Sequence, residues 1–267
     1  MDILSYLLAV LIGISLGLIG GGGSILTVPI LVYVAGVNPI LATAYSLFVV
    51  GASSLVGTVN NFRKGLVSVK TAIIFAVPSF VAVYLTRLYI IPALPDQLFS
   101  FGSLAITKEL GIMLFFAFVM VVAALSMLRK KSAPEEEATI EAITYNYPLI
   151  GIEGFIVGIL TGLVGAGGGF LIIPALVLLA KLPMKLAVGT SLTIIAAKSL
   201  IGFIGDIQAG QLIDWPFLLL FTACSVVGIV IGGILSNYIP GHKLKKGFAW
   251  FVLAMAAIIL IKELLLN

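Results

Sequence analysis

The sequence predicts an all-α membrane protein: a polytopic transmembrane helical bundle of two inverted repeats, with helices broken at glycine and two half-length helices. Composition, the lengths of the apolar segments and a duplicated glycine pattern support this prediction. Of the 267 residues, 61% are hydrophobic and only 10% are charged, whereas a soluble domain carries about 25% charged residues. The chain is therefore expected to lie in a lipid bilayer, and a soluble domain or a nucleic-acid-binding protein is excluded.

Apolar segments define the expected helices. A helix needs about 20 residues to cross a hydrocarbon core about 30 Å thick. The segments of the first half are 2–19, 25–37, 39–61, 69–92 and 108–128, and those of the second half are 148–164, 170–180, 184–204, 215–237 and 246–265. Segments 25–37 and 170–180 rise only about 20 Å or less, so they are expected to be half-length helices. The crossing number stays open between about eight and ten.

One hydrophilic stretch divides the chain. Residues 129–147 carry charges of both signs and have no apolar period long enough to span. The predicted organisation is therefore a first transmembrane repeat at 1–128, a polar cytoplasmic linker at 129–147 and a second transmembrane repeat at 148–267.

The two halves match each other without a gap when the chain is shifted by 145 residues. Residues 13–36 then lie over residues 158–181, so that Gly20 falls on Gly165 and Pro29 on Pro174. Small, helix-interrupting residues at matched positions of two apolar halves are typical of secondary transporters built from repeats.

Equivalent loops of the two halves carry opposite charge. The loop after segment 39–61 contains Arg63, Lys64 and Lys70, whereas its counterpart contains Asp206 and Asp214. Because basic loops face the cytoplasm, equivalent loops are expected on opposite sides of the membrane. This predicts inverted repeats with the N-terminus outside, in a multi-pass protein of the inner (cytoplasmic) cell membrane.

The contiguous glycines are the first candidate site. Gly20 to Gly23 disfavour a continuous helix, because each glycine costs about 1 kcal/mol relative to alanine. We expect a loop and then a helix that starts at Ile25, is capped by Ser24 and presents free N–H groups. Gly165 to Gly169 are expected to do the same before Phe170. Helix N-termini bind anions, so both stretches are candidates for substrate binding.

Other glycines have a simpler interpretation. Glycines spaced by four residues allow membrane helices to pack closely. This packing role is expected for Gly13, Gly17, Gly158 and Gly162, and it is also the alternative for the contiguous stretches.

Polar residues inside apolar segments are the second candidate. Lys198 lies well inside segment 184–204, and Ser53 is its equivalent in the first half. Ser46 and Ser191 lie on the same polar stripes, seven residues before Ser53 and Lys198. A charge at this depth is costly unless it is paired or solvated, so Lys198 is suited to holding a transported anion. The alternative is that Lys198 snorkels or caps a helix.

Two further charged residues are expected near segment ends. Arg87 lies close to Pro92, so its side chain is expected to snorkel to the membrane surface. Asp206, like Asn60 and Asn61, is expected at a helix end, as a loop former or as a ligand.

The duplicated G-x-GGG-x-x-x-x-x-P pattern resembles the TauE/SafE family of sulfite-exporter-type membrane proteins. The resemblance covers both halves, with Ser24 standing where the second copy has Gly169, and Ala166 where the first has Gly21. It implies a permease of the cytoplasmic membrane that carries sulfur-containing anions such as sulfite or organosulfonates.

The predicted function is a secondary exporter or permease for such small anions. A passive small-anion channel and a non-transporting membrane accessory protein are the alternatives. We expect no enzymatic activity, cofactor or metal site; the partners are a small anionic substrate and the lipid bilayer, with a proton or sodium ion as the candidate coupling ion and the oligomeric state left open. The predicted substrate-binding residues are Gly20, Gly21, Gly22, Gly23, Ser24, Ser46, Ser53, Gly165, Gly167, Gly168, Gly169, Ser191 and Lys198.

Overall fold

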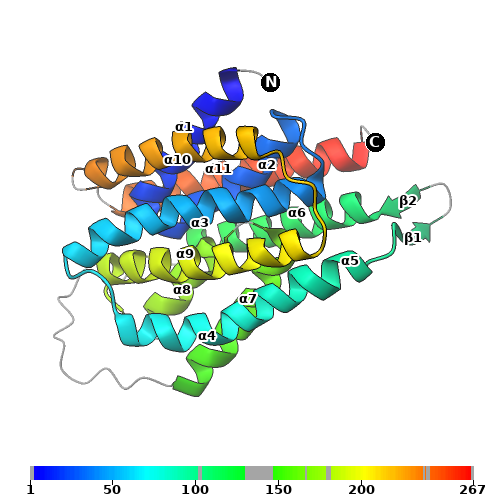
Figure 1. Cartoon of the computed structure of the whole chain (residues 1–267). Helices are drawn as coiled ribbons and strands as arrows, with labels where there is room; N and C mark the ends of the chain where they lie inside the picture. Colours follow the sequence, from blue (N-terminus) through cyan, green and yellow to red (C-terminus); the bar gives the residue numbers. More distant parts are fainter. Residues whose placement is uncertain are drawn as a thin grey trace.

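The computed structural model describes residues 3–101, 104–129, 147–165, 167–178, 182–236, 238 and 241–265, and helices dominate it (Figure 1). The helices of the first half are α1 (Ile3–Ile19), the 3₁₀ helix η1 (Gly20–Leu26), α2 (Thr27–Tyr33), α3 (Pro39–Arg63), α4 (Val69–Leu85), the π-helix η2 (Thr86–Ile90), α5 (Ile91–Ala93) and α6 (Lys108–Arg129). Those of the second half are α7 (Tyr147–Val164), α8 (Gly169–Leu178), α9 (Met184–Gln208), α10 (Trp215–Leu235) and α11 (Gly241–Leu265).

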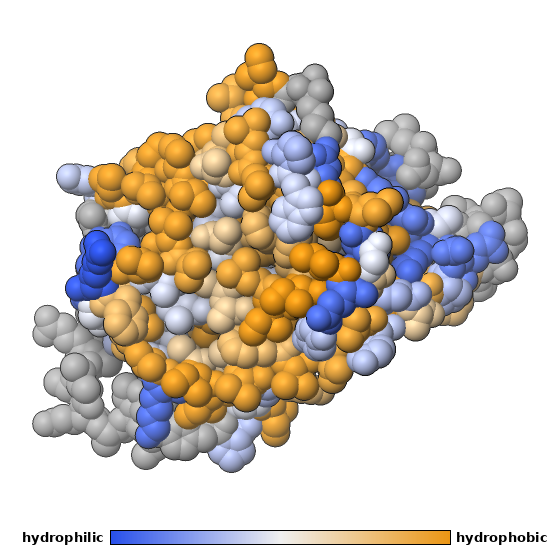
Figure 2. Space-filling model, viewed as in Figure 1, coloured by the Kyte–Doolittle hydropathy of each residue, from blue (hydrophilic) through white to orange (hydrophobic). Residues whose placement is uncertain are grey.

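Several helices are suited to a bilayer. Within the described residues, four helices are long and apolar enough to cross a membrane: Pro39–Arg63, Val69–Ala93, Lys185–Gln208 and Trp215–Leu235. Figure 2 shows one face of the molecule, where apolar residues cover most of the middle and hydrophilic residues gather toward the two ends. An apolar band between polar ends matches the hydrocarbon core and its two interfaces.

The structure confirms the predicted helices, including the short ones, and corrects four details. Gly20–Leu26 is a 3₁₀ helix, not a loop, and the next α-helix begins at Thr27 instead of Ile25. Ser24 does not cap it, because its hydroxyl donates to the carbonyl of Gly21. The all-α prediction also missed an antiparallel pair of strands, β1 (Gln97–Phe101) and β2 (Leu104–Thr107), between α5 and α6. Most of the predicted linker, 129–147, lies outside the described residues.

The two central helices, α3 and α9, pack against each other and run in opposite directions (Figure 1). The same opposition holds for α4 and α10, so the turn after α3 and the turn after α9 lie at opposite ends of the bundle (Figure 1).

Glycines mediate the two most extensive contacts at the sides of this central pair. α1 packs on α10, where a Cβ on Gly13 would come within 2.8 Å of the Gly228 Cα atom. α7 packs on α4, where a Cβ on Gly158 would come within 2.6 Å of the Ser79 carbonyl oxygen. Such short distances exclude any larger side chain, which supports the packing role expected for the glycines spaced by four.

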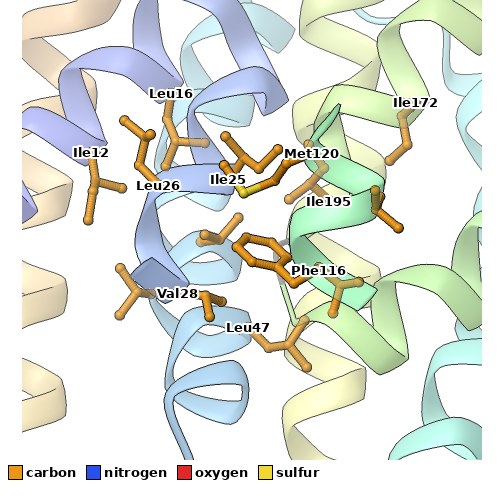
Figure 3. Close-up of a cluster of buried hydrophobic side chains, with 14 of the residues drawn as sticks. Ile12, Leu16, Ile25, Leu26, Val28, Leu47, Phe116, Met120, Ile172 and Ile195 are labelled. Atoms are coloured by element: carbon orange, nitrogen blue, oxygen red, sulfur yellow. The ribbon is translucent and has the colours of Figure 1, made fainter. Parts of the chain in front are cut away.

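The apolar core connects both halves. Side chains of α6 such as Phe116 and Met120 lie among side chains of the first half, such as Ile25, and of α9, such as Ile195 (Figure 3). All four are fully or almost fully buried. The core therefore holds the glycine stretches of both halves in fixed positions.

Candidate substrate-binding site

The two glycine stretches meet in the interior. A Cβ on Gly21 would overlap the Cα atom of Gly169, and a Cβ on Gly169 would overlap Gly21 in turn. A Cβ on Gly167 would lie 3.4 Å from the Cβ of Ser24. The backbones of η1 and of the segment leading into α8 therefore touch directly, an approach that only glycine allows.

The second stretch forms the predicted loop before a helix. Gly165, Gly167 and Gly168 have positive φ angles of 74°, 65° and 64°, which glycine adopts without steric penalty. The carbonyl of Gly168 accepts hydrogen bonds from the backbone N–H groups of Leu171 and Ile172 in the first turn of α8. The loop and the start of α8 thus match the expectation, except that α8 begins at Gly169 rather than Phe170.

Lys198 reaches this loop from α9. Its side chain is fully buried, and the Nζ atom donates a 2.8 Å hydrogen bond to Thr161 Oγ1 on α7. A Cβ on Gly168 would lie only 2.7 Å from Nζ. The Thr161 hydroxyl in turn donates to the carbonyl of Val157. Snorkelling of Lys198 is therefore wrong: the ammonium ends inside the protein, against the glycine loop.

The Lys198 ammonium has unused hydrogen-bonding capacity. An ammonium carries three N–H donors, and within the described part of the chain one of them has an acceptor, on Thr161. No carboxylate forms an ion pair with Lys198 among those residues. A buried cation without a counter-ion favours a negatively charged ligand, because the ligand restores the charge balance.

The other predicted residues fall into two groups. Gly20 approaches Ser191, since a Cβ on this glycine would lie 3.4 Å from Ser191 Oγ, and Gly22 and Gly23 continue η1 from there. Ser46 and Ser53 on α3 are buried but do not bind the loop: Ser53 Oγ donates to Ser225 Oγ at 2.9 Å, and Ser46 Oγ has no hydrogen-bond partner among the described residues.

A second buried cation was placed incorrectly from the sequence. Arg87 does not snorkel: its side chain is fully buried and its Nη1 atom lies 3.3 Å from Asp206 Oδ1 and donates to Thr43 Oγ1 at 2.8 Å. Asp206 is also buried, so it is not a loop former. The position of Arg87 within an apolar segment was the available signal, since a charge there needs a partner. Thr161 and Thr43 were missed because a threonine in an apolar run carries no comparable signal.

Apolar spans around broken helices, with a buried cation that has no ion pair in the described part of the chain, are typical of a membrane transport protein. The chain belongs to the sulfite exporter TauE/SafE family, whose family model matches residues 5–259. The resemblance read from the glycine pattern is thereby confirmed.

Proteins similar in sequence to this chain are named as membrane transporters. The chain is 32% identical over 252 residues to a "Probable membrane transporter protein" of Xylella fastidiosa, covering 92% of this chain and 90% of the relative. It is 31% identical over 255 residues to the "Probable membrane transporter protein YunE" of Bacillus subtilis, covering 86% of each. A shorter match, 28% over 105 residues, is to "Sulfite exporter TauE/SafE family protein 5" of Arabidopsis thaliana, covering 39% of this chain and 23% of that protein. No solved structure matches. The chain is thus a multi-pass membrane protein of a transporter family.

Proposed function

We propose that this protein is a secondary transporter of small sulfur-containing anions such as sulfite or organosulfonates in the cytoplasmic membrane. The Lys198 ammonium, held against the Gly165–Gly169 loop, carries the proposal. Removing a small anion from water is costly unless fixed positive charge and N–H donors replace its hydration. Lys198 supplies both, and the glycine loop lets backbone approach the same place without side chains.

The site proposed for the anion is the junction of the two glycine stretches. Gly20 to Ser24 would form one wall, and the loop residues Gly165 and Gly167 to Gly169 the other, with Ser191 and Lys198 from α9. Ser46 and Ser53 are proposed to line the same path from α3, as hydroxyls that a passing anion contacts. The name of the Arabidopsis relative supports sulfite as the first anion to test.

We further propose that residues 1–128 and 148–267 are inverted repeats joined by a cytoplasmic linker at 129–147. Reciprocal contacts support this arrangement. Gly20 lies against Val188, while Gly165, the equivalent of Gly20, lies against Thr43, the equivalent of Val188. Contacts of this kind are expected at a two-fold axis, where each partner contributes the same surface.

Matched backbone conformations and opposed helices agree with the same proposal. Gly20 and Gly165 have φ angles of 71° and 74°, and Gly65 and Gly210, also equivalent positions, have 69° and 84°. The opposite directions of α3 and α9 (Figure 1) are what an inverted pair requires. The basic loop after α3 would then face the cytoplasm.

Labelling of single cysteines tests this topology. In a Cys224→Ala background, Lys64→Cys should react with a membrane-impermeant maleimide only from the cytoplasmic side, and Leu212→Cys only from outside. Both side chains are exposed, and Leu212 retains 90% of its accessible surface, so access to the reagent is not limiting. Labelling of both cysteines from the same side would contradict the inverted arrangement.

Transport in liposomes tests the substrate. The purified protein should accumulate radiolabelled sulfite or one of thiosulfate, sulfate and methanesulfonate with saturable kinetics, and the rate should respond to an imposed proton or sodium gradient. Chloride serves as the control anion. Flux that does not saturate would indicate a passive channel instead, and absence of flux for every anion would favour an accessory role.

A further inference from the structure

Arg87 occupies a local distortion of the fold. It lies in η2, the π-helical turn between α4 and α5, where the backbone N–H of Ile91 donates to the carbonyl of Thr86. π-Helical turns interrupt α-helices frequently at functional sites. This turn directs the guanidinium toward α3 and α9, where Nη1 donates hydrogen bonds to Thr43 Oγ1 and Asp206 Oδ1.

The Arg87–Asp206 contact leaves most of the available hydrogen bonds unused. Arginine and a carboxylate can form two parallel hydrogen bonds, but here a single pair of atoms, Nη1 and Oδ1, is in contact at 3.3 Å. The Nε and Nη2 atoms of Arg87 and the Oδ2 atom of Asp206 are buried and have no hydrogen-bond partner within the described ranges. Buried polar groups without partners are costly, which makes a purely structural role a poor explanation of this pair.

The glycine loop connects this pair to Lys198. Thr161 accepts the hydrogen bond from Lys198 Nζ, and its carbonyl accepts one from the Gly165 N–H at 2.7 Å. Gly165 lies against Thr43, which binds Arg87. The loop therefore approaches Lys198 directly at Gly168 and contacts Thr43, the hydrogen-bond partner of Arg87, at Gly165. Asp206 follows Lys198 on α9 by eight residues, about 12 Å along the helix.

We propose that Arg87 is a second binding residue for the transported anion and that Asp206 is the internal counter-ion which the anion displaces. This proposal rests on the proposed transport function. The anion is first held by Lys198 at Gly168 and passes toward Gly165 and Arg87, where it accepts hydrogen bonds from Nε and Nη2, the donors without a partner among the described residues. Asp206 neutralises Arg87 when no anion is present, so the guanidinium is never left as an uncompensated buried charge.

Binding measurements on purified protein in nanodiscs test this exchange. Radiolabelled sulfite, thiosulfate, sulfate and methanesulfonate are the probes, and the tightest-binding one is used for the variants. Asp206→Asn removes the competing carboxylate, so we expect binding at least fivefold tighter than wild type. Arg87→Met should weaken binding at least tenfold. Arg63→Met is the control, because Arg63 is an exposed arginine at the end of α3.

A double variant separates binding from stability. Arg87→Met alone leaves Asp206 buried without a partner and could misfold, whereas Arg87→Met with Asp206→Leu removes both charges. We expect the double variant to fold and still to bind at least tenfold more weakly than wild type.

Other results would overturn the proposal. Wild-type affinity in the double variant, or no tightening in Asp206→Asn, would show that the pair is structural and leave the Lys198 site intact. Absence of anion binding by the wild type would overturn the transport function together with this inference.

Discussion

Replacing Lys198 by methionine should weaken anion binding at least tenfold, equivalent to about 1.4 kcal/mol, and abolish measurable transport. Methionine keeps most of the apolar stem of lysine and removes its charge, so the change isolates the electrostatic contribution from packing. The loss is expected because the Nζ atom is fully buried, has one hydrogen-bond partner in the described structure and lies against Gly168. Titration of the protein in nanodiscs with radiolabelled anion measures the dissociation constant directly.

Two further variants test whether the loss in Lys198→Met is caused by the missing charge at this position. Lys185→Met removes an exposed lysine from the first turn of the same helix, and should leave affinity unchanged. Lys198→Arg keeps the charge but enlarges the head group in a packed site, so an intermediate affinity is expected. If Lys198→Met folds and binds the anion as wild type does, the backbone of the glycine loop holds the anion alone and Lys198 has a structural role.

Gly168→Ala should also weaken anion binding about tenfold, because the added Cβ displaces the Lys198 ammonium instead of removing its charge. The added Cβ would overlap the Thr161 hydroxyl and lie 2.7 Å from Lys198 Nζ, so the ammonium must leave its position beside the loop. Alanine also strains the left-handed backbone of this residue, whose φ angle is 64°, by about 1–2 kcal/mol. Anion titration and thermal unfolding in detergent measure the two effects separately.

Gly65→Ala is the matched control for this variant. Gly65 has nearly the same φ angle, 69°, but a Cβ there would have no heavy atom within 4 Å. Gly65→Ala should therefore be destabilised by a similar amount, because its backbone is strained in the same way, but it should bind the anion with wild-type affinity. Equal affinities of Gly168→Ala and Gly65→Ala would show that the approach of the loop to Lys198 does not matter for binding.

The central cation could be predicted from the sequence, but its surroundings could not. A lysine within an apolar segment can be recognised from the sequence alone, and the free-energy cost of placing its charge in a membrane follows from its position in that segment. Its partner Thr161 belongs to another helix, 37 residues away. The hydroxyl of a threonine in an apolar helix commonly donates to the backbone of its own helix, as Thr161 does to Val157, and the local sequence does not say which donor it also accepts from. That donor is Lys198, and the tertiary arrangement of α7 and α9 brings its ammonium to Thr161.

Arg87 shows even more clearly that the partner of a buried charge cannot be predicted from the local sequence. Near a predicted segment end and Pro92, an arginine can reach the membrane surface or turn inward, and the local sequence permits both. The choice is made by Asp206, which is 119 residues away and is brought to Arg87 by the packing of α4 on α9. The partner chosen by a buried charge is a property of tertiary contacts, not of the local segment.

The sequence by itself determined the membrane class, the approximate positions of the helices, the matched halves and the presence of a lysine within an apolar segment. These follow from hydrophobicity, helical rise and residue identity, which act locally. Tertiary structure alone decided that η1 is a 3₁₀ helix while its counterpart is a loop, and that Gly21 meets Gly169. It also brought Lys198 to Gly168, and brought Thr43, the partner of Arg87, to Gly165. Those outcomes depend on which backbones can approach closely, and that is set by the packing of both halves against each other.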